Sequence, residues 1–313
     1  MADWSEILKE LQATNFDYDA CCKKYLNELS VYTGRNLIIY YSGWLQKSGA
    51  PTPLLVINDL DKNAFMTTIK GLDRTKGLDL VLHTPGGDTA ATESIIDYLC
   101  TMFSDIRVIV PQLAMSAGTM IACSADSILM GKHSSLGPID PQYPIQINGS
   151  TFFVPAHGLI EEFKTASEQI KDDASKAYVW QPILQKYNPT ILGEAQKAID
   201  WSSKIISERL NTRMLKNKTT AERKKVIKKI LKELGDHSVN LSHSRHLSYD
   251  KCKEIGLVVD LLESNQDLQE KVLSVHHALM HTLGATLAAK ITMNHDGIMY
   301  VQQIPIIQQN PKP

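Results

Sequence analysis

Short apolar runs alternate with helical patterns between residues 78 and 130, and this alternation constrains the fold more than any other feature. Three apolar runs have the length and composition of buried strands: Leu78–His83, Ile106–Val110 and Ser127–Met130. Between them, Thr89–Phe103 and Met115–Ala125 have apolar or small residues at helical spacing. Strands and helices that alternate over such short distances form βαβ units with right-handed crossovers. The sequence therefore predicts an α/β fold with a parallel sheet.

Helices and further strands are predicted on both sides of this core. Apolar spacing predicts helices over Asp3–Leu29, Asp61–Ile69, Val154–Lys171, Tyr178–Lys232 and Asp267–Lys290. Apolar runs predict strands over Arg35–Tyr41, Leu257–Leu261 and Ile298–Val301, the last after a turn at Asn294–Gly297. No repeat or linker interrupts the chain. We therefore expect a helical extension at residues 1–30, one core at 31–265, and a C-terminal helix with a short hairpin-like tail at 266–313.

Composition narrows the class of protein without indicating its chemistry. The 313 residues carry a formal net charge of −1, so no global field favours nucleic acid as a partner. The five cysteines are too few and odd in number for a disulfide framework. No apolar run reaches the ~18 residues of a membrane span. The first residues lack the basic and apolar pattern of a signal peptide. We expect a cytoplasmic protein without a transmembrane segment.

A glycine pair follows the first of the three strands. In Thr84–Thr89 the chain passes from the strand through Gly86 and Gly87 into a helix. Paired glycines let the backbone approach a ligand closely, and free amides at such a turn bind anions or oxyanions. An ordinary strand-to-helix turn would have the same residues. The pair alone therefore leaves both interpretations open.

A serine stands at the second strand-to-helix turn. Ser116 lies between small residues in Ala114–Gly118, where a helix that begins close to the sheet would expose its hydroxyl. The Ala117 amide would then become an oxyanion donor. The alternative is a serine that caps the helix. Because the carboxyl ends of parallel strands share one edge of the sheet, this turn and the glycine turn are expected to meet, which favours catalysis.

These two turns together resemble the Clp protease and signal peptide peptidase A superfamily. The interval from Gly87 to Ser116 is typical of the Clp proteolytic subunit. The run Ser135–Gln142 (SLGPIDPQ) and the segment Gly256–Val259 resemble the soluble branch called serine dehydrogenase proteinases. The resemblance extends from about Arg35 to Val301. It implies a Clp protease/crotonase-like fold with parallel ββα units and added helices at both ends. It also implies that Ser116 is the nucleophile and that Gly86, Gly87 and Ala117 form the oxyanion hole.

This interpretation does not by itself identify the general base. A serine hydroxyl needs a proton acceptor, yet Pro138–Pro141 stands where the Clp subunit has its histidine. Signal peptide peptidase-like enzymes instead use a lysine further on, in a window that holds His157 and Lys164 here. We favour His157, because its ordinary pKa of ~6.5 suits proton transfer near neutral pH, whereas Lys164 lies among glutamates. Either residue could instead have no catalytic role. Asp140 would orient the base or simply end a turn.

Other polar groups point less clearly to chemistry. His277 and His281 have i, i+4 spacing, but no carboxylate stands at ligand spacing beside them, so we expect packed or interface histidines and no metal. His243 is interpreted as structural or close to the site. The basic segment Lys216–Lys232 has an apolar stripe and predicts an amphipathic helix. That helix would have one buried face or would contact a membrane surface peripherally. No nucleotide-binding motif occurs, and we expect no cofactor.

The sequence thus predicts a serine peptidase that acts on peptides or unfolded proteins and assembles into a homo-oligomer, as the resemblance implies. The missing histidine at the Clp position motivates an alternative, a catalytically inactive scaffold or peptide-binding protein with the same fold. A crotonase-type acyl-CoA enzyme is a third reading, against which the serine at the turn argues.

Overall fold

The computed structural model describes residues 4–147 and 149–305, so Met1–Asp3 and the last residues of the predicted tail lie outside it. The chain forms two compact units. The first combines the residues up to Leu136 with those from Leu247 onward, and the second is Gly137–His246. The second unit is thus inserted within the first, and the core predicted at 31–265 spans parts of both.

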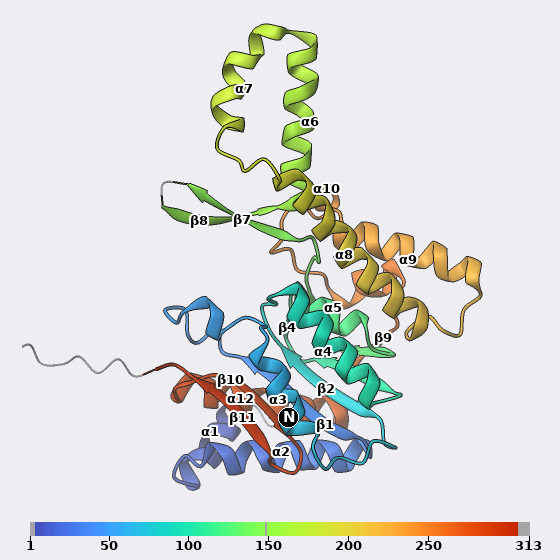
Figure 1. Ribbon diagram of the computed structural model, residues 1–313. Coiled ribbons are helices and arrows are strands. Elements are labelled where there is room, and N and C mark those ends of the chain that lie inside the picture. The colour runs from blue at the N-terminus through green and yellow to red at the C-terminus, as the bar shows by residue number, and fades with distance from the viewer. Residues whose placement is uncertain (1–3, 148, 306–313) are drawn as a thin grey trace, which may run out of the picture. The chain divides into compact units, whose positions relative to one another are not determined.

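A seven-stranded sheet forms the centre of the first unit (Figure 1). Five strands run parallel, in the order β1 (Asn36–Ser42), β2 (Leu78–His83), β3 (Ile106–Val110), β5 (Ser127–Met130) and β9 (Val259–Leu261). Two antiparallel strands, β10 (Ala288–Asn294) and β11 (Met299–Gln303), extend the sheet beyond β1. The predicted parallel sheet is therefore confirmed.

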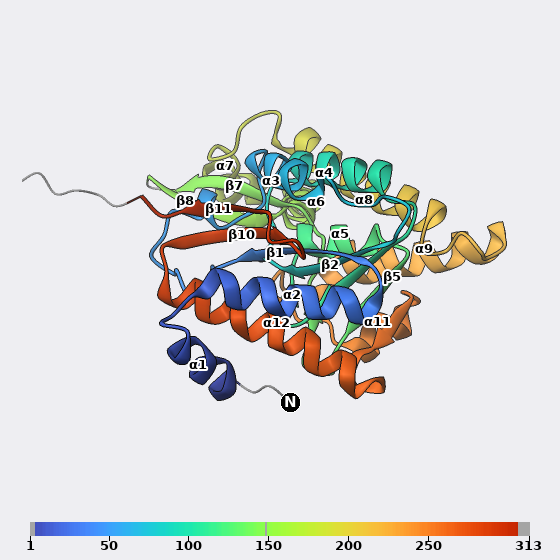
Figure 2. The same cartoon turned by 90° about the horizontal axis from the view of Figure 1, so that it is seen from below.

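Helices cover both faces of this sheet. The helices α1 (Trp4–Ala13), α2 (Tyr18–Thr33) and α12 (Gln266–Ala285) lie on one face, and α3 (Leu60–Ile69) and α4 (Thr89–Met102) lie on the other (Figure 2). Successive strand residues point to opposite faces, and Leu37, Ile39 and Tyr41 of β1 join the apolar core beneath α2 and α12. The predicted N-terminal helices are thus part of this core.

One predicted helix is wrong at its C-terminal end. The helix expected over Asp267–Lys290 stops at Ala285, and Ala288–Asn294 form β10. Alanine and lysine favour helices, but here they pair with β1, with Ile291 opposite Tyr41. All seven residues of β10 are buried. Tertiary pairing of this buried strand therefore overrides the local helical preference.

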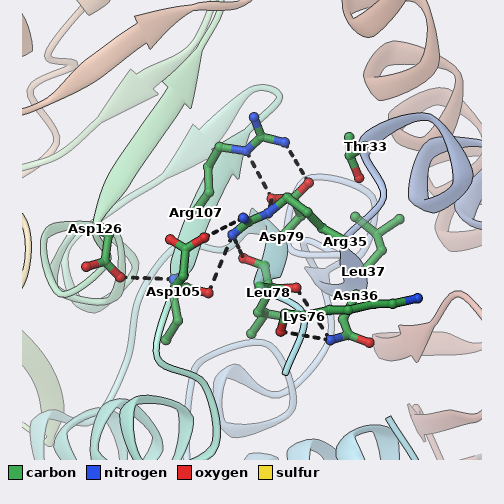
Figure 3. A network of polar contacts seen from close by, with 12 residues as sticks. Thr33, Arg35, Asn36, Leu37, Lys76, Leu78, Asp79, Asp105, Arg107 and Asp126 are labelled. Carbon is green, nitrogen blue, oxygen red and sulfur yellow. Dashed lines mark hydrogen bonds and ion pairs between the residues drawn. The ribbon is translucent and has the colours of Figure 1, made fainter. Parts of the chain in front are cut away.

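An ion-pair network joins the amino ends of three parallel strands (Figure 3). The fully buried carboxylate of Asp79 in β2 accepts from Arg35 Nε at 2.7 Å. It also accepts from Arg107 Nε at 3.0 Å and Nη2 at 2.6 Å. Arg35, just before β1, additionally pairs with Asp105 at the start of β3. The network links these strands at their amino ends, opposite the carboxyl ends.

The second unit contains a hairpin and a set of helices. The hairpin joins β7 (Gln142–Ile147) to β8 (Ser150–Pro155), with Gln142 opposite Pro155. It was not predicted, and the helix expected from Val154 begins at Ala156. The helices are α6 (Ala156–Asp172), α7 (Ala177–Leu184), α8 (Ile191–Thr212), α9 (Thr220–Gly235) and α10 (His237–Asn240). The basic segment forms α9, which buries Ile227, Ile230 and Leu234, so its predicted apolar face is packed within the protein.

No helix in the described part of the chain is long and apolar enough to cross a membrane. All five cysteines are free thiols, and four of them are buried.

Candidate active site

The glycine turn lies between two other backbone segments of the first unit. Gly86 has a φ of 102°, and a Cβ atom on it would lie 2.8 Å from the Ser116 Cβ and 3.0 Å from the Ala117 nitrogen. A Cβ atom on Gly87 would collide with the backbone of Ile57. Only glycine therefore permits this close approach on both sides. An ordinary strand-to-helix turn would not require either contact.

Ser116 has an unusual backbone conformation. Its φ of 51° and ψ of −114° are rare for a residue with a side chain, and such strain concentrates at functional sites. The helix α5 (Ala117–Cys123) begins directly after it, and the Ser116 side chain caps none of the helix amides. The capping role considered for Ser116 is therefore absent. Its half-buried hydroxyl remains available for chemistry.

Small residues allow α5 to begin close to the sheet, as predicted. A Cβ atom on Gly118 would lie 2.5 Å from Cγ2 of Thr84, at the end of β2. Thr84 also binds the serine turn through its backbone, donating to Leu113 O at 3.1 Å and accepting from Met115 N at 3.0 Å. These contacts hold the serine turn and the glycine turn together at the carboxyl edge of the sheet.

Two backbone amides at this junction are free. Among the described residues, the N–H groups of Gly87 and Ala117 donate no hydrogen bond to another protein group. Neighbouring groups are paired: Ile57 N donates to Gly86 O at 2.8 Å, and Asp88 N donates to Ile57 O at 2.9 Å. Unpaired amides close to a serine are the kind of donor that an oxyanion requires. The structure thus brings Ser116, Gly86, Gly87 and Ala117 together.

A buried aromatic cluster lies directly behind the glycine turn. His83 is fully buried, with its ring centroid 4.3 Å from that of Trp44 and 5.3 Å from that of Tyr41. Tyr41 in turn hydrogen-bonds to His276 Nδ1 at 3.1 Å. Burial lowers the pKa of His83 to about 3, and the Leu113 backbone opposes this shift only in part. His83 is therefore neutral and serves packing, a role that the sequence did not indicate.

A buried carboxylate in the second unit binds two histidines. Asp140 Oδ1 lies 2.8 Å from His243 Nδ1, and Asp140 Oδ2 lies 3.3 Å from His237 Nδ1. Gln142 Nε2 donates to the same carboxylate at 2.9 Å. A carboxylate that binds Nδ1 of a histidine fixes the ring and its tautomer, so that Nε2 is left as a proton acceptor. Asp140 therefore orients both histidines, which the sequence could not show, because they lie about a hundred residues away from it.

The two base candidates from the sequence also lie in the second unit. His157 is half-buried in the first turn of α6. Lys164 has a 73% exposed side chain, and its ammonium lies 3.9 Å from Glu168 one helical turn on. Lys164 therefore lies on a solvated face of α6, where its ammonium is paired with a carboxylate. Of the two, His157 is better suited to accept a proton.

The remaining histidines of interest are packed against the N-terminal helix. His281 Nε2 lies 3.0 Å from the Trp4 carbonyl oxygen, and the Trp4 ring lies against His277 and His281. Within residues 4–147 and 149–305, no group of three or more histidine, cysteine or acidic side chains is arranged to hold a metal ion.

The fold and these turns define an α/β protein with a serine at a strained strand-to-helix turn and free amides beside it. The chain belongs to the family of ClpP-like SDH-type serine proteinases, whose model matches residues 52–284. The uncharacterized protein MJ0137 of Methanocaldococcus jannaschii is 30% identical over 64% of this chain and 59% of its own length. The uncharacterized protein MJ1495 of the same organism is 28% identical over 72% of this chain and 64% of its own. The chain thus spans about three-fifths of the length of these relatives.

Solved structures of a membrane-bound protease are also similar to this chain. A serine-to-alanine variant of the 1510-N membrane-bound stomatin-specific protease has a TM-score of 0.40 and 16% identity, covering 69% of this chain and 79% of that one. A lysine-to-alanine variant of that protease, in complex with a substrate peptide, has a TM-score of 0.25 and 15% identity, covering 59% and 75%.

Proposed function

We propose that this protein is a serine peptidase in which Ser116 attacks the peptide carbonyl. The Gly87 and Ala117 amides bind the oxyanion that forms, and Gly86 permits the close approach of the two turns. The observation that carries the proposal is the positive φ of Ser116 beside these two unpaired amides. An inactive scaffold has no reason to retain a strained serine and free amides at one junction.

We propose His243, oriented by Asp140, as the proton acceptor. Support comes from the 2.8 Å contact between Asp140 Oδ1 and His243 Nδ1, which leaves Nε2 as the ring nitrogen that can accept a proton. His157 and Lys164 remain the candidates that the sequence motivates. Neither has a buried carboxylate among its hydrogen-bond partners in the described residues, and for this reason we rank His243 first.

Labelling with a fluorophosphonate tests the nucleophile. The reagent phosphonylates an activated serine, so we expect the wild type to be labelled at neutral pH and the Ser116→Ala variant not to be. Ser134→Ala is a matched control, because this buried serine hydrogen-bonds to Val110 O and has no proposed role in the reaction. An unlabelled wild type would overturn the proposal in favour of a scaffold.

Four further variants identify the base by the rate of the same labelling. We expect His243→Gln to slow labelling by about 100-fold or more, and Asp140→Asn to act in the same direction. His157→Gln and Lys164→Met should stay within about threefold of the wild type. If His157→Gln or Lys164→Met produced the large loss instead, the base would be assigned to that residue.

We also propose peptides or unfolded proteins as substrates, a homo-oligomeric assembly and a cytoplasmic location. The oligomeric state is read from sedimentation of the full chain. A peripheral membrane contact through 216–232 is less favoured, because α9 uses its apolar face for packing. Failure of the full chain to sediment with anionic phospholipid vesicles would exclude that contact.

A further inference from the structure

A buried ion pair lies next to the glycine turn. Lys290 of β10 and Asp61 of α3 have 1% exposed side chains, and Lys290 Nζ lies 2.8 Å from Asp61 Oδ2. Tyr40 Oη donates to the same oxygen at 2.9 Å, and Gln302 Nε2 donates to Asp61 Oδ1 at 2.8 Å. Burial lowers the pKa of Lys290, and the charge of Asp61 opposes this shift. The pair is thus fully enclosed and held by two further side chains.

Both members of the pair bind the backbone of one short segment, Val56–Asn58. Lys290 Nζ donates to Val56 O at 2.8 Å. Asp61 Oδ2 accepts from Asn58 N at 2.9 Å. The two charged groups therefore hold the residues on either side of Ile57, and they fix the direction in which its own N–H and C=O point.

Ile57 links this segment to the glycine turn through backbone hydrogen bonds. Its N–H donates to Gly86 O and its carbonyl accepts from Asp88 N, so both bonds flank Gly87. Because a Cβ atom on Gly87 would collide with the Ile57 backbone, the two chains are in direct contact. A displacement of Val56–Asn58 would therefore move or rotate the Gly87 amide.

Stability alone does not account for such a pair. A buried ion pair is often no more stable than apolar residues of similar size, because removing both charges from water offsets their attraction. Fixed hydrogen-bond directions are what charged groups supply and apolar side chains do not. Amides that bind an oxyanion need this kind of fixed direction, because they act only when aimed at the developing charge.

We infer that Lys290 and Asp61 are positioning residues that aim the Gly87 amide at the oxyanion by holding Val56–Asn58 in place. The inference rests on the proposed peptidase function. The inference gives Lys290, which lies on the antiparallel strand β10, a part in a reaction that occurs at the carboxyl ends of the parallel strands.

The double variant Lys290→Met/Asp61→Asn tests this inference, because it removes both charges and leaves no unpaired buried ion. We measure fluorophosphonate inactivation of the full chain as a maximal rate and a half-saturating concentration, below the melting temperature of each variant. We expect the maximal rate to fall about 10- to 100-fold, since loss of one oxyanion donor costs about 100-fold or more. The half-saturating concentration should change less than threefold. Hydrogen exchange of residues 84–92 should accelerate.

A matched control is the variant Arg107→Met/Asp79→Asn, which breaks a partly buried ion pair at the amino ends of the parallel strands. It should keep the wild-type inactivation rate. The inference would be overturned if Lys290→Met/Asp61→Asn kept the wild-type inactivation rate and hydrogen exchange. It would also be overturned if the control lost as much of its inactivation rate as this variant. If the wild type itself were not labelled, the peptidase proposal would fail. Unchanged exchange at 84–92 would then still refute the positioning role.

Discussion

A serine with a positive φ is strained, and Ser116 keeps this conformation at the centre of the candidate site. The cost of such a backbone is about 1–3 kcal/mol, and the surrounding contacts must maintain it. Here the maintaining contacts are the close approach of Gly86 and the hydrogen bonds of Thr84 to both sides of the turn. The strain holds the hydroxyl out of the helix that follows.

Because of this strain, replacing Ser116 by glycine rather than alanine should increase stability, although both changes should abolish activity. Ser116→Gly should raise the free energy of unfolding by about 1 kcal/mol over Ser116→Ala, because only glycine relieves the backbone strain. Both variants should lose fluorophosphonate labelling. Urea unfolding of the two variants side by side measures the difference. Equal stability would show that the turn is not strained at this residue.

Burial of His83 predicts a dependence of stability on pH. The unfolded state takes up a proton near pH 6.5, whereas the folded state does so only near pH 3. Stability is therefore fully present above pH 6.5 and is lost as the pH falls toward 3, by up to about 1.4 kcal/mol per pH unit. His276 acts in the same direction, because burial lowers its pKa as well.

The variant His83→Phe keeps an aromatic ring beside Trp44 and removes one titrating group. Its unfolding free energy should fall less steeply than that of the wild type between pH 6 and 4. Urea unfolding at several pH values in this window measures both slopes. Identical slopes would show that His83 does not contribute to the acid sensitivity.

Among the elements, the amino ends of β1, β2 and β3 are linked through the buried carboxylate of Asp79. Asp79→Asn should lower the free energy of unfolding by about 3 kcal/mol, because two arginines lose a desolvated partner. Glu194→Gln is the matched control, since Glu194 forms an exposed pair with Lys197 and its loss should leave the urea midpoint unchanged. A loss below about 1 kcal/mol for Asp79→Asn would show that the strands pair without this network.

The same elements show what the sequence can predict and why. The β2 strand matches its predicted bounds because a short apolar run ends at Pro85 and two glycines. The β10 strand could not be predicted, because Ala288–Lys290 favour a helix and only pairing with β1 and β11 makes them a strand. The hairpin had a local signal in the alternating polar and apolar residues of Gln142–Ile147, which was overlooked.

In the candidate site, too, one part could be predicted from the sequence and another could not. The meeting of the glycine turn with the serine turn could be predicted, because small residues beside a strand end are a local pattern. The contact of His243 with Asp140 and that of Lys290 with Asp61 join residues far apart in sequence. No spacing rule relates such residues, so only the fold could show these pairs.

At the scale of the whole molecule, the chain leaves the first unit after Leu136 and returns to it at Leu247, which is a direct neighbour. Leu136 and Leu247 exchange two backbone hydrogen bonds, Leu136 N to Leu247 O at 3.1 Å and Leu247 N to Leu136 O at 2.9 Å. A short glycine-serine turn could therefore replace residues 137–246. We expect the shortened chain to fold cooperatively, because the sheet and its helices lie outside the replaced segment.

The same shortened chain should not be labelled at Ser116, because it lacks His243 and the other base candidates. Far-ultraviolet circular dichroism during thermal unfolding checks the fold, and fluorophosphonate labelling checks the site. Labelling at the wild-type rate would contradict every base assignment made above.

The inserted position of the second unit has a consequence for synthesis of the chain. The ribosome completes β5 and then makes residues 137–246 before β9, α12 and β10 exist. At 5–20 residues per second, this interval is on the order of ten seconds. Throughout it, β1 and β5 are both unpaired edges, and the apolar face later covered by α12 is open. The nascent chain is therefore most exposed to aggregation, and to capture by chaperones, while its second unit is being made.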